Sequence, residues 1–276
     1  MMTPAVRPPA VAGLFYPADG LALQAQVGEM LASAIPADAG APAPKVMIVP
    51  HAGYVYSGPV AANAYAAIAR VRTTVRRVVM LGPAHRMPVR GFVLPAARVF
   101  ATPLGNVDVS HEGCIALQRR ADVVVDDAPH ALEHCLEVQL PFLQTVLDDF
   151  EIVPLLVGDA RPQAVAEVLG LLWGGPETLI LISSDLSHYH PYRHAQACDR
   201  ETVEQILQLR GDLADDQACG ARPLNGLLRV AALRELEPRL LDLRNSGDTA
   251  GDRQRVVGYA SIVFTERESH EHPVRH

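Results

Sequence analysis

The stretch KVMIVPHAGYVYSG, residues 45–58, joins an apolar strand to the start of a helix through a short, stiff turn. Apolar residues run through 46–50 without alternating with polar ones, which is typical of a strand covered on both faces. Ser57 is a typical N-terminal cap for the alanine-rich segment 57–70 that follows. The stretch therefore predicts a strand-turn-helix unit with His51 in the turn.

The rest of the chain repeats this alternation. Apolar, β-branched segments at 76–82, 150–158, 177–184 and 255–264 are predicted strands. Helical periodicity appears at 130–149, 161–174, 194–210 and 223–236, and residues 92–110 predict short strands with a hairpin at a sheet edge. Together these segments predict an α/β fold: a single domain, 1–276, with a central, largely parallel or mixed sheet flanked by helices. We expect an ordered core of about 5–265 and a frayed polar tail at 266–276.

Composition excludes several classes of protein. A formal net charge of −7 argues against binding nucleic acid, and the basic cluster RVRTTVRR that begins at Arg70 reads as a helix end and turn. Neither a membrane-length apolar run nor a secretion signal is visible, so we expect a cytoplasmic protein without a membrane partner. The four cysteines are widely spaced without a CxxC pair, which indicates neither a disulfide framework nor a zinc ribbon.

Three predicted strands lead into histidines. VMIVP precedes His51, VVMLGPA precedes His85, and LILISSDLS precedes His188, with Asp185 three residues before it. Ligands of open α/β sheets bind beyond the carboxyl ends of the strands, where these side chains would meet. Glycine and proline stiffen the loops around His51 and His85. Imidazoles suit zinc, iron and copper, and the cluster therefore predicts a metal or catalytic site that needs a third ligand.

The candidates for that third ligand are Asp185, His188, His134, Glu137 and Cys219. His134 and Glu137 are three residues apart in the predicted helix 130–149, so they either face one pocket or form a surface pair. Cys219 precedes a predicted helix whose dipole would favour its thiolate.

The remaining histidines and cysteines carry weaker signals. His130 shares the face of His134 only if the helix is continuous. Cys114, Cys135 and Cys198 lie in helical patterns typical of buried structural thiols. The three histidines of the tail indicate a mobile end rather than a metal site.

Other enzyme classes lack their local signatures. GxGxxG after a strand, GxxxxGK[ST], GxSxG and HExxH are all absent from the sequence. SSDLSH brings serine, aspartate and histidine together, but a hydrolytic triad needs a base oriented by a separate group. Hydrolysis thus stays an alternative behind metal binding.

Six ordered motifs resemble the Memo family, whose bacterial members are called AmmeMemoRadiSam system protein B. They are AGLFYP (12–17), VPHAGYVYSG (49–58), LGPAH (81–85), EHCLEVQLPFL (133–143), SSDLSHY (183–189) and CGARP (219–223). The resemblance implies a fold similar to the class III non-haem iron extradiol dioxygenases. It implies iron or copper held by His51, His85 and Cys219, with His188 at the acid/base position and Asp185 and His134 in the same cavity.

Two functions follow as hypotheses. In the first, the chain is a metal-dependent redox enzyme similar to a dioxygenase, although a thiolate in place of the dioxygenases' glutamate argues against transferring ring cleavage with the fold. In the second, the same pocket is a non-catalytic module that binds a small molecule, a peptide or a partner protein. The resemblance also implies radical SAM and AMMECR-type partner proteins.

Overall fold

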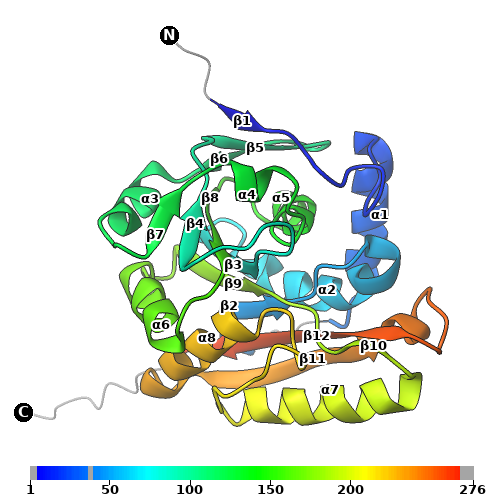
Figure 1. The fold of residues 1–276 in the computed structure, drawn as a ribbon. Coiled ribbons are helices and arrows are strands. Elements are labelled where there is room, and N and C mark those ends of the chain that lie inside the picture. Colours follow the sequence, from blue (N-terminus) through cyan, green and yellow to red (C-terminus); the bar gives the residue numbers. More distant parts are fainter. Residues whose placement is uncertain (1–4, 37–39, 268–276) are drawn as a thin grey trace, which may run out of the picture.

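A mixed sheet of 12 strands runs through the computed structural model, which describes residues 5–36 and 40–267 (Figure 1). The strands are β1 (Val6–Arg7), β2 (Pro44–Val49), β3 (Arg77–Pro83), β4 (Phe92–Leu94), β5 (Val99–Thr102), β6 (Gly105–Val109), β7 (Val123–Val125), β8 (Glu151–Val157), β9 (Thr178–Ser183), β10 (His188–His190), β11 (Glu237–Asn245) and β12 (Val256–Thr265). They are ordered β1-β5-β6-β8-β3-β9-β2-β12-β10, with β11 beside β12, and with β4 beside β7 and β8. The predicted α/β fold with a mixed sheet is confirmed.

The centre of the sheet is parallel. Strand β9 pairs in parallel with β2 on one side and β3 on the other, and β3 pairs in parallel with β8. Strand β12 is antiparallel to β2, while β5 and β6 form the hairpin expected within 92–110. The carboxyl ends of β2, β3 and β9 therefore meet at one edge of the sheet.

Helices cover both faces of this sheet. They are α1 (Gly20–Ala32), α2 (Tyr54–Ile68), α3 (His111–Gln118), α4 (Ala128–Ala131), α5 (Leu140–Val146), α6 (Pro162–Leu171), α7 (Tyr192–Leu207) and α8 (Ala221–Leu233), with 3-10 turns at Ala69–Val71, Glu137–Gln139 and Ser246–Asp248. Figure 1 shows α1, α2 and α5 on one side of β2 and β12, with α6, α7 and α8 on the other. Among the described residues, none of these helices has the length and apolar character needed to cross a bilayer.

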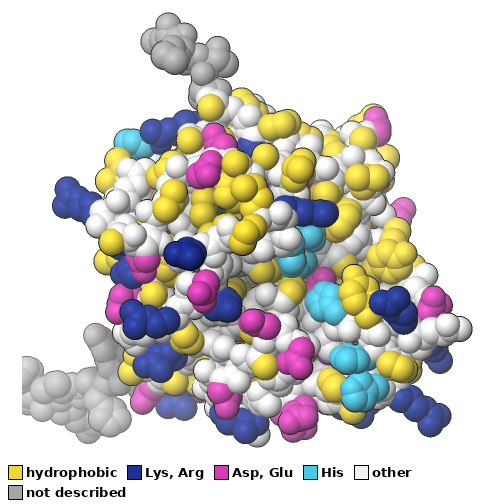
Figure 2. Space-filling model, in the orientation of Figure 1, with side chains coloured by type: hydrophobic (Ala, Val, Ile, Leu, Met, Phe, Trp, Pro, Cys, Tyr) yellow, Lys and Arg dark blue, Asp and Glu magenta, His cyan; other side chains and the backbone are white. Residues whose placement is uncertain are grey.

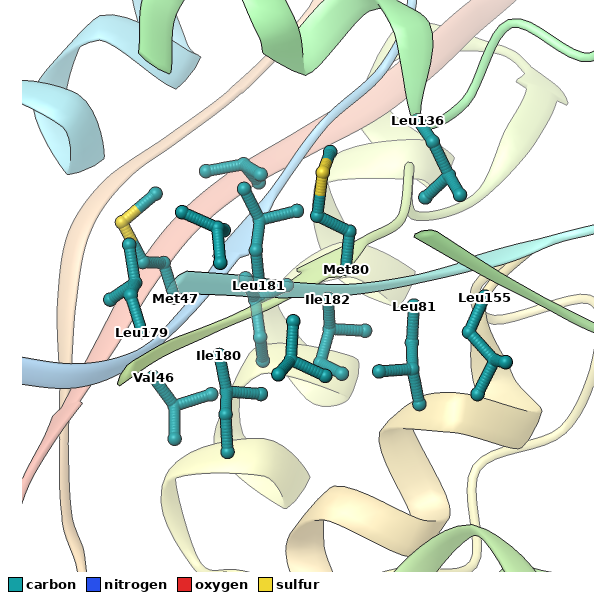
Figure 3. Close-up of a cluster of buried hydrophobic side chains, with 14 of the residues drawn as sticks. Val46, Met47, Met80, Leu81, Leu136, Leu155, Leu179, Ile180, Leu181 and Ile182 are labelled. Carbon is teal, nitrogen blue, oxygen red and sulfur yellow. The ribbon is translucent and has the colours of Figure 1, made fainter. Parts of the chain in front are cut away.

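The strands' uninterrupted apolar sequence reflects burial on both faces. Leu179, Ile180, Leu181 and Ile182 of β9 are all fully buried, as are Met80 and Leu81 of β3. Figure 3 shows their side chains pointing alternately to the two sides of the sheet, toward helices on each side. Each such side chain stabilises the fold by about 1.5–3 kcal/mol, so the central strands hold a rigid edge for the site.

The predicted helix 130–149 is wrong as a single element. The segment breaks into α4, an irregular stretch and the 3-10 turn Glu137–Gln139, and then α5. Pro141 cannot donate a helical hydrogen bond, and the Glu133 carboxylate binds the backbone N–H groups of His134 and Cys135 in place of carbonyls one turn earlier. His134 and Glu137 therefore do not share a helix face.

Candidate metal centre

His51, which follows β2, is held in a defined orientation by Ser183 at the end of β9. Ser183 Oγ donates its one hydrogen to the carbonyl of Cys135 at 2.7 Å, so it accepts from His51 Nδ1 at 2.9 Å. Gln139 Nε2 also donates to Ser183 Oγ, at 2.9 Å. His51 is therefore the Nδ1–H tautomer, and the lone pair of its Nε2 faces Cys219 Sγ at 3.3 Å. Burial, followed by the nearby His85 and His134, lowers the pKa of His51, which keeps this ring neutral.

The Glu133 carboxylate binds both the ring of His85 and the backbone of His134. Glu133 is 3% exposed. Oε2 accepts the backbone N–H of His85 at 2.6 Å, and Oε1 accepts His85 Nδ1 at 3.0 Å and the N–H of His134 at 2.9 Å. Burial alone would raise the pKa of Glu133, but the contacts with His134 and His85 hold it well below its ordinary value. With Nδ1 bound to a carboxylate, His85 keeps Nε2 free to coordinate.

The three imidazoles converge. Donor atoms of His51, His85 and His134 all lie within 4.8 Å of one another. The ring centroids are separated by 5.1 Å for His51 and His85, 5.0 Å for His85 and His134, and 5.5 Å for His51 and His134. His134 Nδ1 is buried without a hydrogen-bond partner; it lies 3.2 Å from Glu133 Oε1 but is not aligned for a hydrogen bond. An orphaned buried nitrogen beside two Nε2 lone pairs fits a metal ion.

Cys219 lies next to His51 at the border of the three imidazoles. Its Sγ lies 3.3 Å from His51 Nε2 and accepts the N–H of Asp185 at 3.3 Å. A Cβ on Gly220 would lie 2.6 Å from the Cβ of Ser184, so only glycine lets the two loops come this close. Cys219 does not belong to the group that converges within 4.8 Å. It borders the histidine trio at the His51 edge.

The state of the Cys219 thiol in the metal-free chain depends on burial as well as on the helix end. The residue precedes the α8 cap, Gly220, and burial together with the nearby Asp185 raises the pKa of its thiol to about 12. Burial disfavours a charged thiolate more strongly than the helix end favours it. A bound ion would have to displace the proton.

Asp185 and His188 complete the wall of the site. Asp185 Oδ1 accepts the backbone N–H of His51 at 2.8 Å, and burial raises its pKa to about 7. His188 lies half-buried in β10, and burial lowers its pKa. Both residues, together with His51, His85, His134 and Cys219, line one open pocket of about 1010 Å³. The pocket thus brings together six of the seven candidate site residues from the sequence, all but Glu137.

Two other candidates lie elsewhere. Glu137 turns away from the pocket, where it accepts from Arg7 at 2.5 Å and from the hydroxyl of Tyr16 at 2.6 Å. His130 is buried, with Nε2 3.0 Å from the carbonyl of Val93. Both residues stabilise the fold outside the pocket through these hydrogen bonds. The tail histidines lie outside the described residues.

Sequence reasoning missed Glu133 and Ser183. Both stand inside motifs already singled out, directly before His134 and at the end of β9. The available signal was a carboxylate and a hydroxyl adjacent to candidate ligands, because metal-binding histidines usually donate their second ring N–H to such groups.

The sequence comparisons relate nearly the whole chain to one family. A family model described as Memo-like protein matches residues 7–263. A MEMO1 family protein of Methanopyrus kandleri is 37% identical over 279 residues, covering 94% of this chain and 98% of that protein. One from Sulfolobus acidocaldarius is 34% identical over 283 residues, covering 94% and 99%. A solved structure of an uncharacterized protein from Escherichia coli K12 aligns with a TM-score of 0.48 at 11% identity, over 79% of this chain and 98% of that one. The chain belongs to the Memo-like protein family.

Proposed function

We propose that this chain is an iron- or copper-binding redox protein whose open pocket admits a small substrate beside the metal. When bound, iron or copper supplies one-electron chemistry that no amino-acid side chain in the pocket provides. The single observation that carries the proposal is the engagement of Nδ1 on both His51 and His85, by Ser183 and Glu133, which leaves two Nε2 lone pairs in a converging group. Histidines that only pack in a core have no need of this arrangement.

The third ligand distinguishes two versions of the site. His134 completes an all-imidazole trio in the observed geometry. Cys219, which the family resemblance favours, completes a softer set and suits copper(I). We assign Cys219 as the ligand and His134 as a pocket residue, because the family resemblance favours the thiol and its Sγ lies 3.3 Å from His51 Nε2, close enough for both atoms to bind one ion.

Asp185 and His188 supply the proton chemistry. A carboxyl with a pKa of about 7 exchanges its proton near neutral pH, which is the condition for an efficient general acid or base. His188, with a lowered pKa, is a neutral base that lines the same pocket. Removal of a proton from the substrate is assigned to His188, and Asp185 holds the His51 loop through the backbone N–H of His51.

Metal content tests the proposal directly. Protein purified without oxygen and without a histidine tag is analysed by mass spectrometry, beside His51→Ala and a His111→Ala control that changes an exposed histidine of α3. We expect near-stoichiometric iron or copper in the wild type and the control, lost in His51→Ala along with substrate-dependent oxygen consumption. Negligible metal in the wild type would contradict the proposal.

A non-catalytic binding module is the second candidate, favoured by the apolar rim of the pocket. Leu14, Val55 and Tyr189 are 80%, 56% and 61% exposed, and all three line the pocket. Exposed apolar side chains around a cavity are typical of ligand or partner recognition. We keep peptides and radical SAM or AMMECR-type proteins as candidate occupants; a pull-down in which metal-free protein binds such a partner as well as loaded protein would favour this function.

A further inference from the structure

A second group of metal-binding side chains lies outside the main site, on α7 and β10. His194 and Cys198 are four residues apart on α7 and therefore share one face of the helix. Cys198 Sγ lies 3.5 Å from His194 Nε2. The ring of His190, in β10, meets that of His194 edge-on with centroids 4.7 Å apart. We propose that His190, His194 and Cys198 form a second metal site, for a tetrahedral divalent ion of the zinc class.

The separation of the Cys198 and His194 donors is compatible with a tetrahedral ion. With metal–sulfur and metal–nitrogen bonds of about 2.3 and 2.05 Å, a tetrahedral angle places sulfur and nitrogen about 3.6 Å apart, whereas a linear arrangement would place them about 4.3 Å apart. The 3.5 Å observed between Cys198 and His194 matches the tetrahedral ion. His194 and Cys198 are the pair already in contact. The donors of all three residues do not lie within 4.8 Å of one another in the described structure, so His190 has to turn its ring to bind, with water in the fourth position.

The surroundings favour a cation. Partial burial and the carboxylates of Asp199, Glu201 and Asp216 raise the pKa of the Cys198 thiol, so negative charge is close to the sulfur. The same field attracts a divalent ion. On binding, the sulfur–hydrogen bond breaks, the metal–sulfur bond forms, and the proton leaves to solvent without any change in oxidation state.

The location suggests what the site does. His190 lines the main pocket, whereas His194 and Cys198 lie outside it. Figure 2 shows histidine side chains along this face, from its centre to the lower right, where β10 and α7 lie in Figure 1. The second site therefore adjoins the pocket through His190, and a bound ion would hold β10 against α7.

Cobalt(II) binding tests the site, because a thiolate ligand gives this ion a strong near-ultraviolet charge-transfer band. The background is His51→Ala/Cys219→Ala, which removes the main site and its thiol. We expect this variant to bind one equivalent of cobalt with the thiolate band. Adding Cys198→Ser should remove the band and weaken binding at least tenfold, and adding His194→Gln should weaken it similarly.

Controls separate the site from folding and from the main centre. Cys114→Ser, on α3 three residues after His111, should leave the band intact, and Cys198→His should retain cobalt without the band. Circular dichroism and thermal unfolding verify the fold of each variant. A background variant that shows no thiolate band at one equivalent, or keeps it after Cys198→Ser, overturns the inference. The wild-type iron or copper content decides the main site independently.

Discussion

Replacing Glu133 by glutamine should weaken metal binding while leaving the protein folded. The carboxylate accepts the N–H and Nδ1–H of His85 and the N–H groups of His134 and Cys135. A carboxamide keeps the size of the side chain but turns one oxygen into a donor. If its oxygen takes the place of Oε1, its amide faces the N–H of His85, donor against donor, where a 2.6 Å hydrogen bond now exists.

The structure sets the size of the effect. A hydrogen bond to a charged group contributes about 1.5–3 kcal/mol, so the free energy of unfolding of Glu133→Gln should fall by about 2–3 kcal/mol. Loss of the group that orients two rings should lower metal affinity about 10–100-fold, which corresponds to about 1.4–2.7 kcal/mol. Urea unfolding of the metal-free protein and anaerobic competition with a chelator measure the two quantities separately.

Glu137→Gln is the matched control. Glu137 is equally buried on the same segment, but it binds Arg7 and Tyr16 instead of the histidines. This variant should lose about 3–5 kcal/mol of stability, since it breaks a buried ion pair, with a smaller effect on metal affinity. If Glu133→Gln binds metal as tightly as wild type, the carboxylate only stabilises the loop, and its assignment as the orienting group is refuted.

Three further changes probe the remaining groups. Ser183→Ala removes the acceptor of His51 Nδ1–H. We expect metal binding, measured by chelator competition, to weaken about tenfold, and the free energy of unfolding, measured in urea, to fall by about 1–3 kcal/mol. Unchanged values for both would contradict the tautomer assignment. The wild-type Cys219 thiol has a pKa of about 12, so it is protonated before a metal binds and should release one proton per ion. Cys219→Ser should abolish this release, measured in weakly buffered solution at pH 7. Equal proton release would exclude Cys219 as a thiolate ligand. Asp185 has a folded pKa of about 7 against 3.8 unfolded, so the native state binds more protons and wild-type stability falls as pH rises from about 4 to 7. Asp185→Asn should remove this slope, gaining up to about 4 kcal/mol relative to wild type above pH 7, and an equal slope in both would refute the shift.

The strand ends could be predicted because they depend on local patterns. Apolar runs of strand length mark β2, β3 and β9, and a histidine or an aspartate follows each of them. In a parallel sheet these ends share one edge, so the meeting of His51, His85 and Asp185 needs only the strand direction. The sequence analysis assigns no element to 237–245, by contrast, and β11 was not predicted, because its pairing with β12 is a tertiary contact.

The segment 130–149 shows where pattern fails. Its apolar spacing is helical, but the backbone conformation is set by hydrogen bonds of Glu133 and Glu137. Both side chains are buried, and each binds groups from distant parts of the chain. Arg7 donates both to Glu137 and to the carbonyl of Glu133, which ties the N-terminal strand to the loop that carries His134. Such long-range polar contacts outweigh local helical preference, and periodicity contains no signal for them.

The position of β9 explains how Ser183 comes to orient His51. Ser183 pairs in register with Val49, two residues before His51, while Ile182 pairs with Leu81 on the other side. A shift of one residue would turn the serine to the opposite face of the sheet and leave His51 Nδ1 without its acceptor. The central strand thus contributes no proposed ligand, yet its register decides which nitrogen of His51 is free to bind a metal.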